Sequence, residues 1–375
     1  MKTRILKIDR HNPDKGKMRA AASVIRRGGI VVFPTETVYG IGTNALSAEA
    51  ARKIYKVKGR PSDNPLIVHA SDMKMASKIG IFPKRYYKIV ESLWPGPITF
   101  VVKARKTVPL EVTGGLKTVA LRIPEHRVAL ELIRESGVPI AAPSANISKK
   151  PSATNAGHAM AYFSGKVDVI IDSGAASIGI ESTILNLGTF TILRPGAFPA
   201  ERIAAAFGRK PIIGVAASGI ADADRASAPG MKYRHYSPDT PLFLYTGAPS
   251  GLAGSMAGIK GSIAFIGSDE SCRILRGRCR TIRLGSRKRP GEIARNLFDG
   301  LIKLDAVGAR FAVIESFSEK GIGLGIMNRI RKAANHTQFS TAAQLKKLAA
   351  RLPEAGVRTA GRKGQERRDA ASGML

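Results

Sequence analysis

The sequence has few cysteines and no long apolar run. Two thiols, Cys272 and Cys279, occur in 375 residues, so the chain is not a small scaffold held by disulfides. Their spacing fits no zinc pattern, and we expect both to be reduced structural thiols. No stretch of about 18 apolar residues occurs, which argues against a membrane-spanning helix. The N-terminus also lacks the apolar stretch and cleavage site of a secretory signal, so a cytoplasmic location is expected.

Several well-known catalytic signatures are also absent. The chain contains no Walker A loop, no Gly-X-Ser-X-Gly elbow and no protein-kinase signature. It contains no run of metal-ligating residues at a familiar spacing. A dedicated protein site for a metal ion is therefore not expected.

Acidic residues are scarce relative to basic ones. The chain has 60 Lys and Arg against 28 Asp and Glu, a formal net charge of +32. Such an excess favours phosphate-rich partners, namely nucleotides, tRNA or anionic surfaces. A general enrichment in Lys and Arg that serves solubility would give the same number. The apolar fraction of 44% is enough to build a core, so a mainly disordered chain is excluded.

The first half alternates helix and strand patterns. Residues 17–28 carry apolar positions at helical spacing and stop at a Gly-Gly pair, which predicts a helix. The β-branched run IVVFPT that follows predicts a buried strand. Because the alternation continues, we expect an α/β fold with a twisted, open sheet. Further strands are predicted in PLIVHA, ITFVVKA, TVALRIP, VPIAAPSA, VDVIIDSG and STILNL.

Four parts are predicted along the chain. Residues 1–208 form the larger α/β domain, and residues 209–240 are rich in Ala, Gly, Ser and Pro, as interdomain linkers are. Residues 241–335 again alternate strands and helices, which predicts a smaller parallel-sheet, Rossmann-like domain. Residues 336–375 are predicted to be a basic, disordered tail, because 328–375 hold 11 Lys and Arg against 3 Asp and Glu.

Two early segments combine residues suited to phosphate chemistry. VVFPTETVYGIGTNA places hydroxyls and backbone amides where a strand ends, and open α/β sheets bind ligands beyond strand ends. In KVKGRPSDNPLIVHA, Lys58 and Arg60 are two apart and would face one side of an extended stretch. Two such cations suit a triphosphate, although a solvated surface pair is the alternative. His69 ends the next strand and is either a ligand contact or a structural side chain.

Two later segments add an isolated cation and several hydroxyls. Arg122 lies in an apolar strand, where it needs an anionic partner. A substrate carboxylate or a structural Asp or Glu would meet that need. Ser144 and Asn146 end another strand, and a hydroxyl-rich loop able to wrap phosphate follows them. Ser182 and Arg194 lie near turns and are unremarkable when taken separately.

Together these segments resemble the YrdC-type threonylcarbamoyl-AMP synthases. The resemblance is carried by PTETVYG, KGRPSDNPL, WPGPITF, LRIPEH, APSANIS and ESTIL, dense over residues 15–208. APGMKYRHYSP and GLGIMNRIRKAA are similar to the long two-domain form of that family. The match therefore extends to about residue 335.

The resemblance implies roles for particular residues. Lys58, Arg60, Ser144 and Asn146 belong to the Lys-X-Arg and Ser-X-Asn signatures taken as catalytic. L-Threonine would be held by Thr37, His69, Arg122, Ala142 through its backbone, and Ser182. ATP would be held by Arg60, Asn64, Thr118, Ser144, Ser152, Arg194 and Tyr236. Because Tyr236 lies in the predicted linker, the linker would fold over the nucleotide as a lid.

The family reaction implies substrates and partners. L-Threonine, bicarbonate or CO2, and ATP would give threonylcarbamoyl-AMP and pyrophosphate, with Mg2+ carried on the nucleotide. A partner complex would then transfer the threonylcarbamoyl group to the adenosine beside the anticodon of tRNAs that read ANN codons. Nonspecific or double-stranded RNA binding, without catalysis, is one alternative, and a carbamoyl-transfer module related to hydrogenase maturation is another. The family often has Gly where Lys149 stands here.

Overall fold

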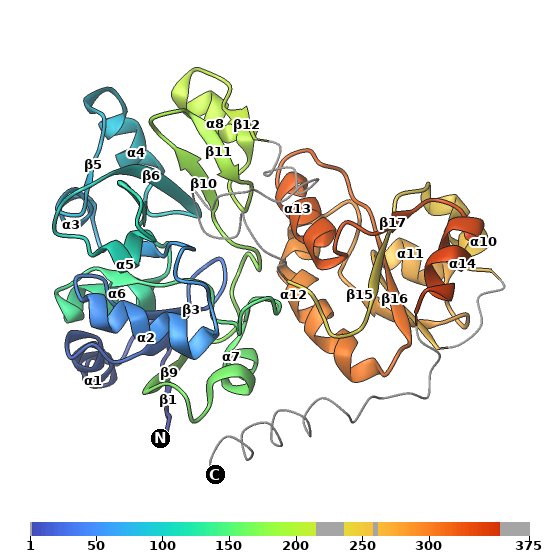
Figure 1. Ribbon diagram of the computed structural model, residues 1–375, viewed down its shortest axis with the longest axis horizontal. Helices are drawn as coiled ribbons and strands as arrows, with labels where there is room; N and C mark the ends of the chain where they lie inside the picture. The colour runs from blue at the N-terminus through green and yellow to red at the C-terminus, as the bar shows by residue number, and fades with distance from the viewer. Residues whose placement is uncertain (1, 215–235, 258–261, 353–375) are drawn as a thin grey trace, which may run out of the picture.

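The chain folds around two separate β-sheets (Figure 1). The computed structural model describes residues 2–214, 236–257 and 262–352. A sheet of 12 strands lies in the first part, called here the N-terminal unit (residues 2–214), and a sheet of five strands lies in the C-terminal unit (residues 236–352). The predicted fold class, a large open α/β sheet followed by a smaller parallel one, is confirmed.

The larger sheet is mixed and strongly non-sequential. Its order is β1-β9-β2-β3-β8-β4-β7-β6-β10-β11-β12, and β5 pairs with β6 outside this path. β4 and β7 run parallel, whereas β8 runs antiparallel to both β3 and β4. The strands are β1 (Arg4–Lys7), β2 (Val31–Phe33), β3 (Gly40–Asn44), β4 (Ile67–His69), β5 (Gly80–Ile81), β6 (Ile98–Ala104), β7 (Thr118–Arg122), β8 (Ile140–Ala141), β9 (Val169–Asp172), β10 (Thr183–Asn186), β11 (Thr191–Arg194) and β12 (Ile212–Ile213).

Helices of the N-terminal unit begin and end at residues with clear capping roles. The Ser47 side chain accepts a hydrogen bond from the Ala50 N–H and caps α2. The same helix ends at Gly59, whose φ of 59° is the left-handed conformation that glycine adopts without strain. The helices are α1 (Lys15–Arg26), α2 (Ala48–Lys58), α3 (Met73–Ser77), α4 (Tyr87–Leu93), α5 (Leu110–Thr113), α6 (Arg127–Ser136), α7 (Ala156–Phe163) and α8 (Ala200–Phe207), with a 3-10 turn η1 (Lys84–Tyr86).

The C-terminal unit is a parallel sheet with helices on both faces. Its order is β15-β14-β16-β13-β17, and every pairing is parallel. α12 and α13 cover one face, and α10, α11 and α14 pack against the other. The elements are β13 (Leu242–Tyr245), η2 (Pro249–Gly251), α10 (Leu252–Ser255), β14 (Ile263–Gly267), α11 (Asp269–Ile274), β15 (Arg280–Arg283), α12 (Pro290–Val307), β16 (Phe311–Glu315), α13 (Gly323–Ala333), β17 (Gln338–Phe339) and α14 (Ala342–Ala350).

The predicted boundaries need two corrections. Residues 336–352 are not a disordered tail, because β17 joins the second sheet and the buried Leu345 of α14 packs in its core. β12 pairs with β11, so the larger sheet continues into the predicted linker, 209–240. Most of that linker, and residues 353–375, lie outside the described residues. Within the described residues, no helix is long and apolar enough to span a membrane.

The two units meet along a seam at the start of α13. A methyl group added to Gly325 would lie 2.7 Å from the Gly196 carbonyl oxygen, and one added to Gly196 would lie 2.3 Å from the Glu181 carbonyl oxygen. Backbone therefore lies directly against backbone here. Ile180 and Ala197 of the N-terminal unit share one apolar cluster with residues of α12 and α13. This seam lies beside the β11 end, where Arg194 is located.

Candidate active site

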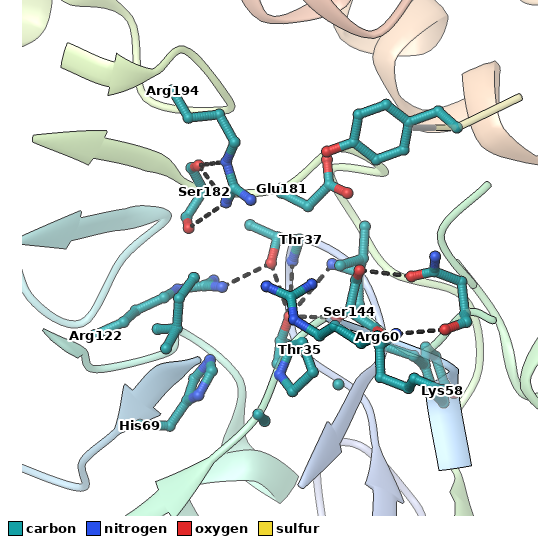
Figure 2. A pocket seen from close by; sticks show the side chains of 18 of the residues that line it. Thr35, Thr37, Lys58, Arg60, His69, Arg122, Ser144, Glu181, Ser182 and Arg194 are labelled. Carbon is teal, nitrogen blue, oxygen red and sulfur yellow. Dashed lines mark hydrogen bonds between the residues drawn. The ribbon is translucent and has the colours of Figure 1, made fainter. Parts of the chain in front are cut away.

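One cavity gathers side chains from distant parts of the N-terminal unit (Figure 2). His69 and Arg122 are direct partners in the parallel β4–β7 pair, so their side chains lie on one face of the sheet. Most of the residues predicted for the site meet here. The cavity is lined by Thr35, Thr37, Val38, Tyr39, Gly40, Lys58, Arg60, Ile67, His69, Arg122, Ala142, Pro143, Ser144, Asn146, Ser148, Lys149, Glu181, Ser182, Arg194 and Tyr236.

Arg122 is buried at one end of the cavity and contacts three groups of the protein. Its Nη1 donates to the Thr37 hydroxyl at 2.8 Å, and its Nε donates to the Gly96 carbonyl at 3.2 Å. Its Nη2 lies 2.6 Å from a carboxylate oxygen of Glu36. The isolated arginine does have an anionic partner, and that partner is the structural carboxylate that the sequence left open as an alternative. A threonine contact at Arg122 stays a prediction.

The imidazole of His69 is held in its neutral form. Burial, together with the nearby Arg122 charge, lowers the pKa of His69 to about 3. Its ring meets Phe33 edge-on, with 6.0 Å between ring centroids. His69 therefore presents an uncharged, weakly basic ring to the cavity at neutral pH.

Lys58 and Arg60 do not lie on one side of an extended stretch, and that interpretation was wrong. Lys58 is the last residue of α2 and Gly59 is left-handed, so the backbone is not extended here, yet both cations line the cavity. The Lys58 ammonium donates to the Ser144 carbonyl at 2.6 Å and to the Asn146 carbonyl. Burial lowers the pKa of Lys58 well below its ordinary value. Lys58 thus stabilises the Ser-X-Asn turn through two carbonyl groups of that turn.

Arg60 braces the loop that follows α2. Its Nη2 donates to the Asn64 side-chain oxygen at 2.5 Å and to the Pro65 carbonyl at 2.9 Å. Burial lowers the pKa of Arg60 to about 10, which leaves the guanidinium charged at neutral pH. Arg60 lines the cavity and Asn64 supports it from behind.

The Ser-X-Asn turn is ordered by its own hydrogen bonds. The Ser144 hydroxyl donates to the Asn146 side-chain oxygen at 2.6 Å. The Asn146 amide donates to the Lys150 carbonyl at 2.9 Å. The backbone N–H of Ala142, just before the turn, donates to the Ile67 carbonyl at 2.8 Å. The carbonyl of Ala142 is therefore the backbone group that a ligand could meet.

Ser182 and Arg194 meet at the other end of the cavity. Arg194 is 6% exposed, and its Nη2 donates to the Ser182 carbonyl at 2.9 Å and to its hydroxyl at 3.3 Å. The Ser182 hydroxyl also lies 2.8 Å from that of Thr99. Two residues that look unremarkable in the sequence form one polar cluster, because β10 and β11 pair as neighbours.

Glu181 is a cavity residue that the sequence analysis missed. One of its oxygens accepts from the Ser152 hydroxyl at 2.6 Å, and the other accepts from Arg329 at 2.9 Å. Burial opposes its charge, but Arg329 and Arg194 outweigh burial and lower the pKa of Glu181. A Glu directly before Ser182, in a chain with few acids, was the signal available. Its buried position could not be read from the sequence.

Tyr236 closes the cavity from the side of the C-terminal unit. It is 4% exposed, and its hydroxyl forms a hydrogen bond with Glu181. Burial raises its pKa, and the Glu181 charge adds to this effect. Most of the linker predicted to act as a lid, 209–240, lies outside the described residues, so the lid stays a prediction.

Three predicted residues do not line this cavity. Asn64 lies behind Arg60, and Ser152 lies behind Glu181. Thr118 begins β7 opposite Lys103, four positions before the cavity residue of that strand. In the described parts of the chain, no group of three or more His, Cys, Asp or Glu side chains could hold a metal ion.

Comparisons with known proteins agree with this architecture. Residues 23–196 match the family model described as telomere recombination, and residues 199–335 match that of the threonylcarbamoyl-AMP synthase C-terminal domain. The chain is 41% identical to a threonylcarbamoyl-AMP synthase of Pyrococcus abyssi, over 87% of this chain and 96% of that one. It is 39% identical to one of Bacillus subtilis, over 84% of this chain and 92% of that one.

A solved structure shows the same arrangement of both units. The crystal structure of P. abyssi Sua5 complexed with L-threonine superposes with a TM-score of 0.84 at 39% identity, over 90% of this chain and all of that one. Both halves of the chain therefore match a single two-domain protein, which rules out a chance match of one domain. The chain belongs to the threonylcarbamoyl-AMP synthase family.

Proposed function

We propose that this chain makes threonylcarbamoyl-AMP and pyrophosphate from L-threonine, bicarbonate or CO2, and ATP. The observation that carries the proposal is one cavity with guanidinium groups at both ends, Arg122 at one and Arg60 and Arg194 at the other. Hydroxyls line the same cavity, and the neutral imidazole of His69 lies next to Arg122 (Figure 2). Such a site can hold an amino acid carboxylate and a triphosphate at the same time.

L-Threonine is assigned to the end that contains Arg122. Arg122 and the Thr37 hydroxyl, 2.8 Å apart, form a polar corner for a carboxylate. His69 and the Ala142 carbonyl offer a neutral acceptor and a backbone acceptor for the amine or the side-chain hydroxyl. Ser182, which accepts from Arg194 at the other end of the cavity, completes the set. The P. abyssi relative that was solved with L-threonine supports this assignment.

ATP is assigned to the end that contains Arg60 and Arg194. Ser144 lies beside Arg60 in this region, and Tyr236 lies across it. Three of the predicted ATP residues would act indirectly, from behind the cavity lining. Asn64 would position Arg60, and Ser152 would position Glu181. Thr118 would act through the start of β7. Mg2+, if carried by the nucleotide, would supply positive charge against the phosphates, in addition to that of Arg60 and Arg194.

The chemistry requires capture of a short-lived intermediate. The neutral threonine amine attacks CO2 and loses a proton, which gives a carbamate. A carbamate oxygen then attacks the α-phosphate of ATP, and pyrophosphate leaves. Holding both partners in one site can lower the barrier by about 7–11 kcal/mol, and the flanking guanidinium groups stabilise the charge on the departing phosphates.

The main alternative is an RNA-binding protein without catalysis, and catalytic activity distinguishes the two. A nonspecific RNA-binding protein would also have a net charge of +32, but it has no need of a buried cavity that contains Lys58, Arg60, Ser144 and Asn146. The product would be handed to a partner complex that modifies tRNA, in keeping with the family. The test is pyrophosphate release by the purified full-length protein. We expect release only when L-threonine and bicarbonate are both present, and equal release without threonine would contradict the proposal.

A further inference from the structure

Arg329 belongs to the C-terminal unit but makes its principal contacts in the N-terminal unit. It lies on α13, and its exposed fraction is 0%. Its Nε donates to Glu181 at 2.9 Å, and its Nη1 donates to the Pro195 carbonyl. Both acceptors lie more than 130 positions earlier in the chain. A fully buried guanidinium thus crosses the seam between the two units.

Its carboxylate partner is part of the cavity wall. Glu181 lines the cavity, and its other oxygen accepts from Ser152 at 2.6 Å. Arg194, on the nucleotide side of the cavity, contributes to keeping Glu181 ionised, and so does Arg329. Cations from both units therefore help to keep this carboxylate ionised.

Tyr236 rests on the same arginine. The Arg329 guanidinium carbon lies 5.7 Å from the centroid of the Tyr236 ring, and the ring of Phe298 on α12 lies 5.1 Å from it. The Tyr236 hydroxyl bonds to Glu181. Its φ of 63° is a conformation that a tyrosine rarely adopts without support from its surroundings. The C-terminal unit supplies that support.

The backbone contact beside Arg329 fixes a second cavity residue. Gly325 lies against Gly196, and Arg329 donates to the Pro195 carbonyl in the same turn. That turn directly follows Arg194. One helix therefore holds the turn after Arg194, the Glu181 carboxylate and the Tyr236 ring.

We propose that Arg329 is a positioning residue of the nucleotide end of the site: it neutralises Glu181 and holds Tyr236 across the cavity, so that the C-terminal unit completes the ATP site. The inference rests on the proposed function, because it takes the Arg60–Arg194 end to be where ATP binds. It assigns the second unit a role in substrate binding. It also predicts that the threonine end, which Arg329 does not contact, is independent of this residue.

Charge gives the sharpest test of this role. In an Arg329→Gln variant, Glu181 is left as an unpaired carboxylate in the wall that faces the triphosphate. Loss of one partner of a buried pair typically weakens binding by about 30-fold or more. A second change, Glu181→Gln, removes that negative charge. Affinity for ATP should then recover if charge is the cause.

The experiment is calorimetry on the full-length protein with threonine and with α,β-methylene-ATP, whose α,β bridge cannot be cleaved. For R329Q we expect the Kd for the nucleotide to rise about 30-fold and the Kd for threonine to change less than about twofold. For R329Q/E181Q we expect recovery to within about fivefold of wild type. R331Q is the matched control, because Arg331 lies on the same helix and pairs with the surface residue Glu319. It should bind both ligands as wild type does.

Each outcome has a distinct meaning. Unchanged nucleotide affinity in R329Q overturns the inference, and so does an equal loss in R329Q and R329Q/E181Q, which would indicate a packing role only. If R329Q fails to fold, the double variant still decides, because it leaves no unpaired buried charge. A loss of about 30-fold in that variant would overturn the inference. Failure of wild type to bind the nucleotide would instead contradict the proposed function.

Discussion

Glu36 and Arg122 form an ion pair of 2.6 Å, with only 5% and 4% of their side chains exposed. The pair lies at the end of the cavity assigned to threonine. Arg122 is therefore neutralised by the protein before any ligand arrives. In the proposed threonine site, the substrate carboxylate would share a guanidinium that already has a partner, which would limit how tightly threonine binds.

Replacing Glu36 by Gln should expose this competition. The variant leaves Arg122 buried and unpaired, which destabilises the ligand-free chain by about 3 kcal/mol. Threonine then becomes the partner anion, so saturating threonine should raise the Tm of E36Q more than that of wild type. Thermal unfolding with and without threonine measures both effects.

Glu49→Gln is the control for this prediction. Glu49 pairs with Lys53 on the surface of α2, and its side chain is 75% exposed. Its loss should change the free energy of unfolding by less than about 1 kcal/mol and should not alter the response to threonine. An equal threonine response in E36Q and wild type would argue against a threonine carboxylate at Arg122.

Two buried histidines should make the fold sensitive to acid. Burial lowers the pKa of His69 to about 3 and that of His126 to about 4. Between these values and the unfolded pKa of about 6.5, the unfolded chain binds protons that the folded chain does not. The free energy of unfolding therefore falls as pH falls through this window, by about 1.4 kcal/mol per pH unit for each histidine.

Urea unfolding between pH 7.5 and 4.5 tests this prediction. H126N should remove about half of the change in the free energy of unfolding with pH. It leaves the cavity lining unaltered, because His126 does not line the cavity. H11N, at an exposed position, should leave the slope unchanged. A wild-type free energy of unfolding that is flat over this range would show that the histidines are not held neutral.

Arg60→Ala should impair ATP use and leave the threonine end intact. A charged donor to phosphate contributes about 1.5–3 kcal/mol, so kcat/KM for ATP is expected to fall about 100-fold, while the Kd for threonine stays close to that of wild type. Arg52→Ala is the control, because Arg52 is a nearby arginine on α2 whose side chain is 59% exposed and does not line the cavity. Steady-state pyrophosphate release, measured on R60A and R52A, gives kcat/KM for both variants. Wild-type turnover in R60A would remove Arg60 from the site.

Lys149→Gly should change stability and activity in opposite directions. Lys149 has a φ of 75°, a conformation that costs a non-glycine residue about 1–2 kcal/mol. Glycine relieves this strain, so the free energy of unfolding should rise by about 1 kcal/mol. The ammonium at the cavity rim is lost, so the KM for ATP should increase severalfold.

Lys149→Ala distinguishes the two effects of that substitution. Alanine removes the ammonium but keeps the strained backbone, so the KM for ATP should rise without a gain in stability. Parallel measurements of unfolding and of KM on the three proteins suffice. A gain in stability in both variants would show that the backbone at Lys149 is not the source of strain.

Local patterns predicted the elements, and long-range contacts limited the prediction of the site. The helix α6 and the strands β6 and β7 follow directly from apolar periodicity in their own segments. Arg122 was correctly expected to need an anion, but Glu36 is recognisable as that anion only once the fold brings the loop after β2 to the end of β7. The Glu181–Arg329 contact joins residues 148 positions apart, and no spacing rule reaches that far.

Two predictions were wrong for reasons that lie within a few residues of the segment concerned. The position of Arg60 relative to Lys58 depends on the end of α2 and the left-handed turn at Gly59, which an assumption of extended backbone overlooks. The helix α14 was taken for a tail because its basic residues dominated the composition. Thr341 and Gln344 form a capping box at its start, and that Thr-X-X-Gln signal followed by Leu345 was present in the sequence. Charge had masked a short amphipathic helix.

The glycine pair at the seam restricts how this protein can be recombined. Because the Gly325 backbone touches that of Gly196, Gly325 does not tolerate even a methyl group without separating the units. A C-terminal unit taken from a relative will join this N-terminal unit productively only if it has glycine at the position of Gly325 and arginine at the position of Arg329. The two units must therefore match each other at this seam. A chimaera that lacks the match would contain two folded units that cannot dock correctly.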